Sequence, residues 1–281
     1  MRDIRLIAAL GPQVSPARTR PARRPPFRIA AVQERWRPDP GEHAEALAAG
    51  IRLAAGEGAQ LVCLQELTLS PYFATDPRGP EAAGVIPEEL PGGPTYSFAA
   101  RMAAETGVHI HASLFERADG SDGLGFNTAV IVAPDGTLVA STRKLHIPVT
   151  AGYHEDRYFR PGPGGPQPFP LVALGSEPDH PGFDTEPLWE SVIVGNAIAN
   201  GVFMVAVNRI GAEGPLRFYG SSFICDPYGR KLVQAPRDEP AVLLADLDLD
   251  QRQDWLELFP FLATRRPDAY GLLAEEAAAA R

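Results

Sequence analysis

The sequence predicts a mixed α/β protein in which two sheets are faced by helices. Short apolar runs alternate with Ala- and Leu-rich segments at helical spacing, and two turns containing Asp and Gly join further apolar runs into hairpins. Hydrophobic residues make up 44% and charged residues 22% of the 281 residues, which is typical of a globular protein with a large buried core.

The regular pattern begins at Phe27 and supports this class element by element. A strand–helix–strand order opens it, and such an order implies a parallel pair of strands. The predicted elements of the first half are a strand at 27–33, a helix within 41–56, a strand at 60–66, a helix at 95–106 and a strand at 108–116. A β-hairpin around Asp135-Gly136 follows at 126–144, and its second arm ends at Lys144.

The second half adds a helix, more strands and a C-terminal arm. Its predicted elements are a helix at 187–200, a strand at 202–208, a hairpin within 221–235 and a strand at 241–249. The arm is amphipathic and is broken by Pro260 and Pro267. We expect its large apolar side chains to be exposed and to pack on a second copy in a homo-oligomer; they are Trp255, Leu258, Phe259 and Phe261.

The two ends differ from this domain of residues 27–270. Residues 1–26 carry six arginines against a single acid, Asp3, with scattered prolines, and we expect a disordered extension. They lack the continuous apolar stretch of a secretory signal. The Ala-rich tail 271–281 is expected to be frayed.

Charge and cysteine usage exclude several classes of partner. The net charge of −9 argues against nucleic acid, because phosphate binding needs a basic surface. No apolar run approaches the roughly 20 residues that span a bilayer, so no membrane association is expected. The two cysteines, Cys63 and Cys225, lie inside apolar runs, which suggests a reducing compartment and predicts a cytoplasmic protein.

Three charged residues are candidates for chemistry. Glu66 ends a predicted strand, Lys144 ends the hairpin, and Glu155 lies among aromatic residues. Taken singly, each has a plainer explanation as a charge at a strand end or on the surface. Together, a carboxylate base and an ammonium in a partly dry cleft would suit acyl transfer, in which the base takes a thiol proton and the cation stabilises the oxyanion.

The histidines are weaker candidates. His109 and His111 alternate on a predicted strand and face one side, a pattern that can bind metal. No third ligand accompanies them at suitable spacing, so we expect a structural pair and no metal. His146 and His154 flank the Lys144 loop and could line the cleft. We find no phosphate-binding loop.

Five segments resemble the nitrilase, or carbon–nitrogen hydrolase, superfamily: LVCLQELTLSPYF, FNTAVIVAPDGTLVASTRKLHIP, GYHEDRYFRPG, NAIANGVFMVAVNRIG and FYGSSFICDPYGR. The likeness extends from residue 27 to about 270 and is greatest to the N-carbamoylputrescine amidase branch, which acts in putrescine and polyamine synthesis. It implies an αββα sandwich that dimerises, a small amide or carbamoyl substrate, and neither metal nor organic cofactor. It also implies a Glu–Lys–Cys triad: Glu66 matches the general base, Lys144 the oxyanion-stabilising lysine, and Glu155 a second acid that positions the base or the substrate.

The resemblance breaks where the cysteine nucleophile should lie. In the family this residue sits on a strand-to-helix elbow after the motif that ends at Gly162, and such a unit needs roughly 30 residues. Here residues 163–170 alone separate Gly162 from Leu171, and their four prolines and two glycines cannot form a central strand or a helix. We therefore predict a sandwich lacking one strand–elbow–helix unit, with an internal deletion near 163–170.

Neither cysteine replaces the missing one. Cys63 lies three residues before Glu66 on one predicted strand, so the two side chains point to opposite faces. Cys225 lies in a hairpin strand, and both cysteines are expected in the core. Three hypotheses remain open: an N-carbamoylputrescine amidase-like hydrolase that is inactive as written, a non-catalytic homologue that binds a ligand or a partner subunit, and a deleted version of an active amidase.

Overall fold

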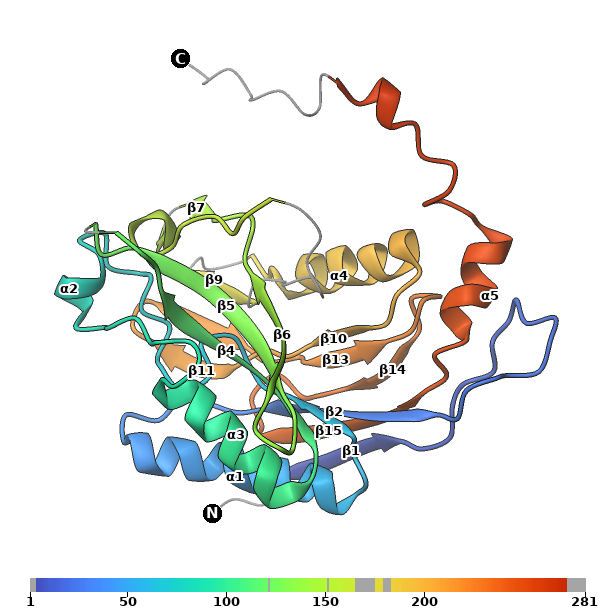
Figure 1. The fold of residues 1–281 in the computed structure, drawn as a ribbon, viewed down its shortest axis with the longest axis horizontal. Helices are drawn as coiled ribbons and strands as arrows, with labels where there is room; N and C mark the ends of the chain where they lie inside the picture. The colour runs from blue at the N-terminus through green and yellow to red at the C-terminus, as the bar shows by residue number, and fades with distance from the viewer. Residues whose placement is uncertain (1–3, 121, 151, 165–174, 179–182, 272–281) are drawn as a thin grey trace.

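The computed structural model describes residues 4–120, 122–150, 152–164, 175–178 and 183–271 (Figure 1). Its helices are α1 (Pro40–Gly56), α2 (Pro80–Ala83), α3 (Pro94–Thr106), α4 (Glu186–Asn200) and α5 (Gln251–Leu258), with 3-10 turns at Glu155–Arg157 and Pro267–Ala269. Its strands are β1 (Arg5–Ala9), β2 (Phe27–Gln33), β3 (Leu61–Cys63), β4 (His109–Arg117), β5 (Gly125–Val132), β6 (Leu138–Arg143), β7 (Val149–Thr150), β8 (Tyr153–His154), β9 (Ser176–Pro178), β10 (Met204–Ala206), β11 (Ile210–Glu213), β12 (Leu216–Tyr219), β13 (Phe223–Cys225), β14 (Lys231–Gln234) and β15 (Ala241–Leu247).

A seven-stranded sheet forms the first layer of strands, in the order β1-β15-β2-β3-β4-β5-β6. The pairs β2–β3 and β3–β4 are parallel, as the strand–helix–strand order predicts, because α1 and α3 return the chain to the same edge. The β4–β5–β6 meander is antiparallel and turns at Gly136, whose φ of +83° suits glycine. This meander brings the end of β6 to the same edge of the sheet as the end of β3, with β4 and β5 between the two strands.

Residues that alternate along the seven-stranded sheet build two separate cores. Ala30, Val62 and Leu244 face one side and pack with α1 and α3. Ile29, Cys63 and Leu243 face the other side and pack against β13, β14 and the residues that follow β14. The seven-stranded sheet is therefore covered by helices on one face and by strands on the other.

The second layer of strands consists of the three-stranded sheets β10-β13-β14 and β11-β12-β9. Helix α4 covers the outer face of the first of these, with Ile193 and Ala197 against Met204 and Phe223. The layers thus run helix, sheet, sheet, helix (Figure 1), and the predicted α/β class is confirmed. Residues 165–170, most of the segment in which we predict the missing unit, lie outside the described residues.

One predicted strand is shorter than expected. We predicted a strand at 60–66, but β3 ends at Cys63, and the chain turns sharply after Gln65. The turn has Leu67 at a φ of +50°, a conformation that non-glycine residues seldom adopt. Glu66 therefore lies on a turn and not in the strand.

The prediction of a disordered N-terminal extension is wrong for residues 4–26. Residues 5–9 form β1, which pairs in parallel with β15 at the edge of the sheet. The arm that follows is tied down by its charges, because Arg18 forms ion pairs with Asp248 and Asp254, and Arg24 with Asp250. The prediction rested on the composition of the segment alone, and it did not take into account the acidic residues at 248–254 with which these arginines pair. The predicted tail lies outside the described residues from 272 onward.

The C-terminal arm differs from expectation at one residue. Trp255 is half-buried, and its indole N–H donates to the carbonyl of Ile198 at 2.8 Å, so it packs within its own chain. Leu258, Phe259 and Phe261 are exposed, as predicted. The segment after α5 extends away from the body of the fold (Figure 1). Within the described residues no helix combines the length and apolarity that crossing a membrane requires.

Candidate active site

Lys144 is placed by the hairpin and by the chain that returns beside it. It follows β6 directly, its backbone N–H donates to the carbonyl of Asn127 at 2.8 Å, and its own carbonyl accepts from Gly162 at 2.8 Å. A Cβ at Gly162 would lie 2.6 Å from the carbonyl oxygen of Arg143, so this close approach needs glycine. The side chain that results is 7% exposed.

Glu66 is placed by the turn that follows β3. The turn is fixed from β4, because the backbone N–H of Leu67 donates to Ser113 Oγ at 3.1 Å and that of Thr68 to the carbonyl of Ser113 at 2.8 Å. Asn127 Nδ2 on β5 donates to Glu66 Oε1. The carboxylate is 11% exposed and points toward the end of β6.

Glu155 lies on the 3-10 turn after β8 and is 2% exposed. The hydroxyl of Tyr72 donates to its Oε1 at 2.7 Å. Burial first, and then the neighbouring carboxylates, raise the pKa of the Tyr72 phenol, so it remains a donor at neutral pH.

The structure brings these three predicted residues into one cluster. Lys144 Nζ lies 3.1 Å from Glu66 Oε1 and 3.0 and 2.9 Å from the two oxygens of Glu155. Burial alone would lower the pKa of Lys144, but the two carboxylates reverse this and hold the pKa above its ordinary value. Burial raises the pKa of Glu155, against the opposing attraction of Lys144. The cluster is thus a shielded ammonium between two carboxylates.

Four residues of the site were missed at the sequence level. Tyr72 and Asn127 contact the carboxylates directly. Arg209 and Glu213 form a buried ion pair whose guanidinium donates to the carbonyl of Glu66 at 2.8 Å. All but Glu213 lie inside the quoted segments, and an arginine between apolar residues and glycine was the signal available for Arg209.

The two cysteines lie elsewhere, as predicted. Cys63 packs between the sheets, and Cys225 packs beneath α4 in a different core cluster. Burial raises the pKa of each thiol to about 12. Neither is therefore a thiolate at neutral pH.

The histidines do not join the cluster through any side-chain hydrogen bond found among the described residues. His146 is exposed and His154 is half-buried. His109 is exposed, whereas burial lowers the pKa of His111 to about 4, so His111 is neutral at pH 7. No group of three or more His, Cys, Asp or Glu residues in the described ranges is arranged to hold a metal ion.

This arrangement can accept a proton at one carboxylate and stabilise negative charge with one ammonium. Both groups are held by buried partners, so they are preorganised and partly shielded from water. Covalent acyl transfer needs a nucleophile as well.

Sequence comparison supports the same interpretation. The sequence model of the carbon–nitrogen hydrolase family matches residues 28–177 and 171–257, which together cover most of the chain. The chain belongs to the carbon–nitrogen hydrolase family. Within this family it is similar to the N-carbamoylputrescine amidase of Solanum lycopersicum, with 33% identity over 264 aligned residues that cover 79% of this chain and 86% of the relative.

Other carbon–nitrogen hydrolases match over similar lengths. The N-carbamoylputrescine amidase of Oryza sativa is 31% identical over 286 residues, covering 87% of this chain and 93% of the relative. A citrullinase of Francisella tularensis is 29% identical over 283 residues, covering 87% and 96%. A solved carbon–nitrogen hydrolase of Helicobacter pylori superposes with a TM-score of 0.76 at 26% identity, covering 90% of this chain and all of that one. The fold predicted from the resemblance is thereby confirmed.

Proposed function

We propose that this chain is a carbon–nitrogen hydrolase of the N-carbamoylputrescine amidase type that keeps the charged part of its site and does not complete the reaction. The observation that carries the proposal is the position of its thiols. The chain has two cysteines, both are buried among apolar side chains in two different core clusters, and burial raises the pKa of each thiol to about 12. The base and the cation therefore have no thiolate between them.

The lengths of the alignments support a missing segment. The Solanum lycopersicum alignment runs over 264 positions but takes in 79% of this chain, about 222 residues, so about 42 positions are filled by the relative alone. The Oryza sativa alignment runs over 286 positions and takes in 87%, about 244 residues, which again leaves about 42. A strand, an elbow and a helix fit in that length. The family model matches in two pieces, and the second begins at residue 171.

The remaining residues have defined roles in the intact reaction. A cysteine thiol would give its proton to Glu66 and add to the carbamoyl carbon, while the Lys144 ammonium stabilises the oxyanion. Glu66 would return that proton to the departing amine and then take one from the water that cleaves the carbamoyl thioester. From N-carbamoylputrescine the products are putrescine, carbon dioxide and ammonia. Without the thiol, the first bond does not form.

The decisive experiment measures ammonia release from N-carbamoylputrescine. We expect no release above the rate without protein, and we expect both thiols to react with a disulfide reagent only after unfolding. Replacing residues 165–170 by the corresponding segment of a plant relative should create turnover of N-carbamoylputrescine. The same replacement with its cysteine changed to alanine should give no turnover. Turnover by the unaltered chain that is lost in Glu66→Gln, and kept in Cys63→Ala and Cys225→Ala, would refute the proposal.

Two other functions remain in view. A non-catalytic binding homologue is favoured by a saturable calorimetric signal with N-carbamoylputrescine in the absence of turnover. A deleted version of an active amidase is favoured if the gene, sequenced across codons 160–175, carries the cysteine segment. All three hypotheses expect a small amide or carbamoyl compound as the ligand and a homo-oligomeric protein.

A further inference from the structure

Arg209 is a fully buried arginine that no proposed chemical step uses. Its side chain is 0% exposed and forms an ion pair with Glu213, which is 4% exposed. One terminal nitrogen lies 2.9 Å from each carboxylate oxygen of Glu213. Burying two charges costs several kcal/mol unless further hydrogen bonds satisfy them, so the other contacts of this pair are informative.

The second terminal nitrogen of Arg209 holds the turn that carries Glu66. It donates to the carbonyls of Glu66 at 2.8 Å, Leu67 at 2.6 Å and Ser70 at 2.8 Å. These carbonyls converge because Leu67 has a φ of +50°. A residue in this sparsely populated region persists only when its surroundings enforce it. Arg209 is thus part of what fixes the direction of the Glu66 side chain.

Glu213 reaches the other carboxylate through Tyr72. Glu213 Oε2 accepts from the backbone N–H of Tyr72 at 2.7 Å. The hydroxyl of the same tyrosine donates to Glu155 Oε1 at 2.7 Å. One ion pair in the second layer of strands is therefore linked to both carboxylates that flank Lys144 in the first.

We propose that Arg209 and Glu213 form a positioning pair that sets the distance of Glu66 and of Glu155 from the Lys144 ammonium. The pair touches neither reacting atoms nor Lys144; it acts through the 66–70 turn and through Tyr72. The proposal rests on the proposed function only in taking the cluster as the site. Arg209→Lys would keep the positive charge. It would lose the planar guanidinium, whose two terminal nitrogens bind the Glu213 carboxylate and the backbone carbonyls of the 66–70 turn at the same time.

The experiment uses the chain's two lysines, Lys144 and Lys231. Unaltered protein labelled with ¹⁵N-lysine gives one buried and one surface ammonium signal, and the pKa of each is followed by nuclear magnetic resonance. Arg209→Lys adds a third signal, from position 209, so Lys144 is assigned in that variant by comparison with the spectrum of Glu213→Asp, which has the original two lysines. In Arg209→Lys and Glu213→Asp, which preserve charge, we expect the pKa of Lys144 to fall by about one unit or more, because a carboxylate has moved away from it. The Lys231 signal should not move.

The matched control is Arg28→Lys, at an ion pair with Asp246 between β2 and β15. It should lower stability and leave Lys144 unchanged. If all three variants lose stability while the pKa of Lys144 stays constant, the pair is merely structural and the inference is wrong. If Arg209→Lys does not fold, Glu213→Asp decides alone. Ammonia release by the unaltered chain would overturn the proposed inactivity and leave this test intact.

Discussion

At the scale of single residues, the candidate site holds more carboxylates than ammonium groups, so its charges do not cancel. One ammonium, on Lys144, faces two carboxylates, and all three side chains are at most 11% exposed. Asn127 and Tyr72 supply neutral donors to the carboxylates, which lowers the cost of the excess negative charge. Lys144 is therefore a structural counter-charge for the two carboxylates, whatever its part in a reaction.

Replacing Lys144 by methionine should destabilise the protein strongly. Two buried carboxylates would lose their counter-charge, and breaking a buried pair in this way costs about 3–5 kcal/mol. The surface ion pair of Lys231 with Glu190 provides the control, because Lys231→Met should cost at most about 1 kcal/mol. Urea unfolding at pH 7 measures both, and equal effects of the two substitutions would contradict the expectation.

The same variant has a defined pH dependence. Because the pKa of Lys144 is raised in the folded state, its stabilisation is complete below the unfolded value near 10.5 and is lost as pH rises through the folded value. The difference between the unaltered protein and Lys144→Met should therefore be steady from pH 7 to 9 and shrink in more alkaline solution.

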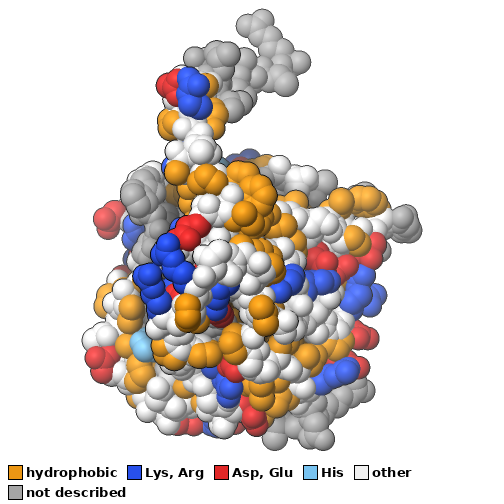
Figure 2. Space-filling model, turned by 90° about the vertical axis from the view of Figure 1, so that its right-hand side faces the viewer, with side chains coloured by type: hydrophobic (Ala, Val, Ile, Leu, Met, Phe, Trp, Pro, Cys, Tyr) orange, Lys and Arg blue, Asp and Glu red, His pale blue; other side chains and the backbone are white. Residues whose placement is uncertain are grey.

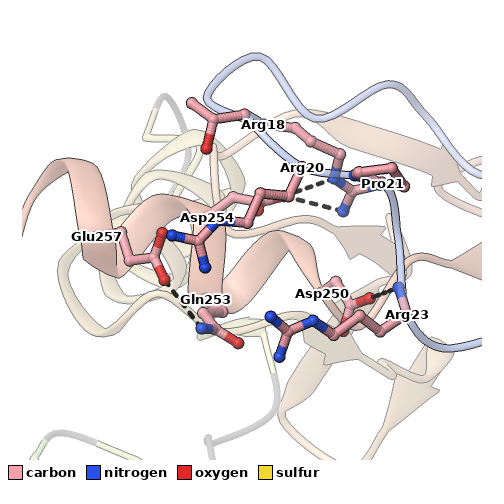
Figure 3. Close-up of a pocket in the computed structure, with 9 residues that line it drawn as sticks. Arg18, Arg20, Pro21, Arg23, Asp250, Gln253, Asp254 and Glu257 are labelled. Atoms are coloured by element: carbon pink, nitrogen blue, oxygen red, sulfur yellow. Dashed lines mark hydrogen bonds and ion pairs between the residues drawn. The ribbon is translucent and has the colours of Figure 1, made fainter.

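At the scale of elements, the N-terminal arm (residues 10–26) forms a clasp, because its polar groups bind acidic side chains of residues 246–254, where β15 leads into α5. Figure 3 shows the contacts of Arg18 with Asp254 and of Arg23 with Asp250. Arg18 also forms an ion pair with Asp248. Asp250 accepts from the backbone N–H groups of Arg23 and Arg24 and from the Arg24 guanidinium. These donors hold the pKa of Asp250 at about 2.

Asp250→Asn tests the clasp. We expect a loss of about 1–2 kcal/mol in the free energy of unfolding, mostly from the two backbone donors, since Arg24 is half-exposed and screened by water. A depressed pKa gives stability that is present above the ordinary value near 3.8 and lost toward pH 2, so the two proteins should converge in acid. Asp268→Asn, at an exposed ion pair with Arg266, should leave the free energy of unfolding nearly unchanged, because water screens this pair.

At the scale of the whole molecule, one face combines charge with exposed apolar rings. Figure 2 shows the side that carries α5 and the N-terminal arm, where arginine and lysine side chains gather beside hydrophobic ones. The rings of Phe259 and Phe261 stack with centroids 5.6 Å apart, and each residue is 45% exposed. Exposed apolar patches mark sites of protein–protein contact, and we expect the partner here to be a second copy of this chain.

We therefore expect sedimentation to give more than the 30.2 kDa of one chain. Changing Phe259 and Phe261 together to serine should shift the protein toward the single-chain mass, because the apolar contact is lost. Ile86→Ser, at a lone apolar residue that is 77% exposed, should not. A single-chain mass for the unaltered protein would show that the arm does not mediate assembly.

Much of the fold followed from local patterns. The helices at α1, α3 and α4, the hairpin that delivers Lys144 and the burial of both cysteines were predicted because periodicity, turn glycines and apolar runs act over short stretches of chain. The order of the four layers came from the resemblance. The early end of β3 was missed, because the turn at Leu67 is held by Ser113 and Arg209, which are distant in sequence.

The sequence by itself determined the family and the number of cysteines, and it predicted the three charged residues of the candidate site. These conclusions need only the order of residues along the chain, because each family motif can be identified from a short stretch of sequence. Only the tertiary structure decided that one ammonium is shared by two buried carboxylates, that the Arg209–Glu213 pair is linked to both, and that residues 5–9 of the arginine-rich N-terminal segment form a strand of the sheet. Burial and charge pairing arise between segments far apart in the chain, and no local pattern records them.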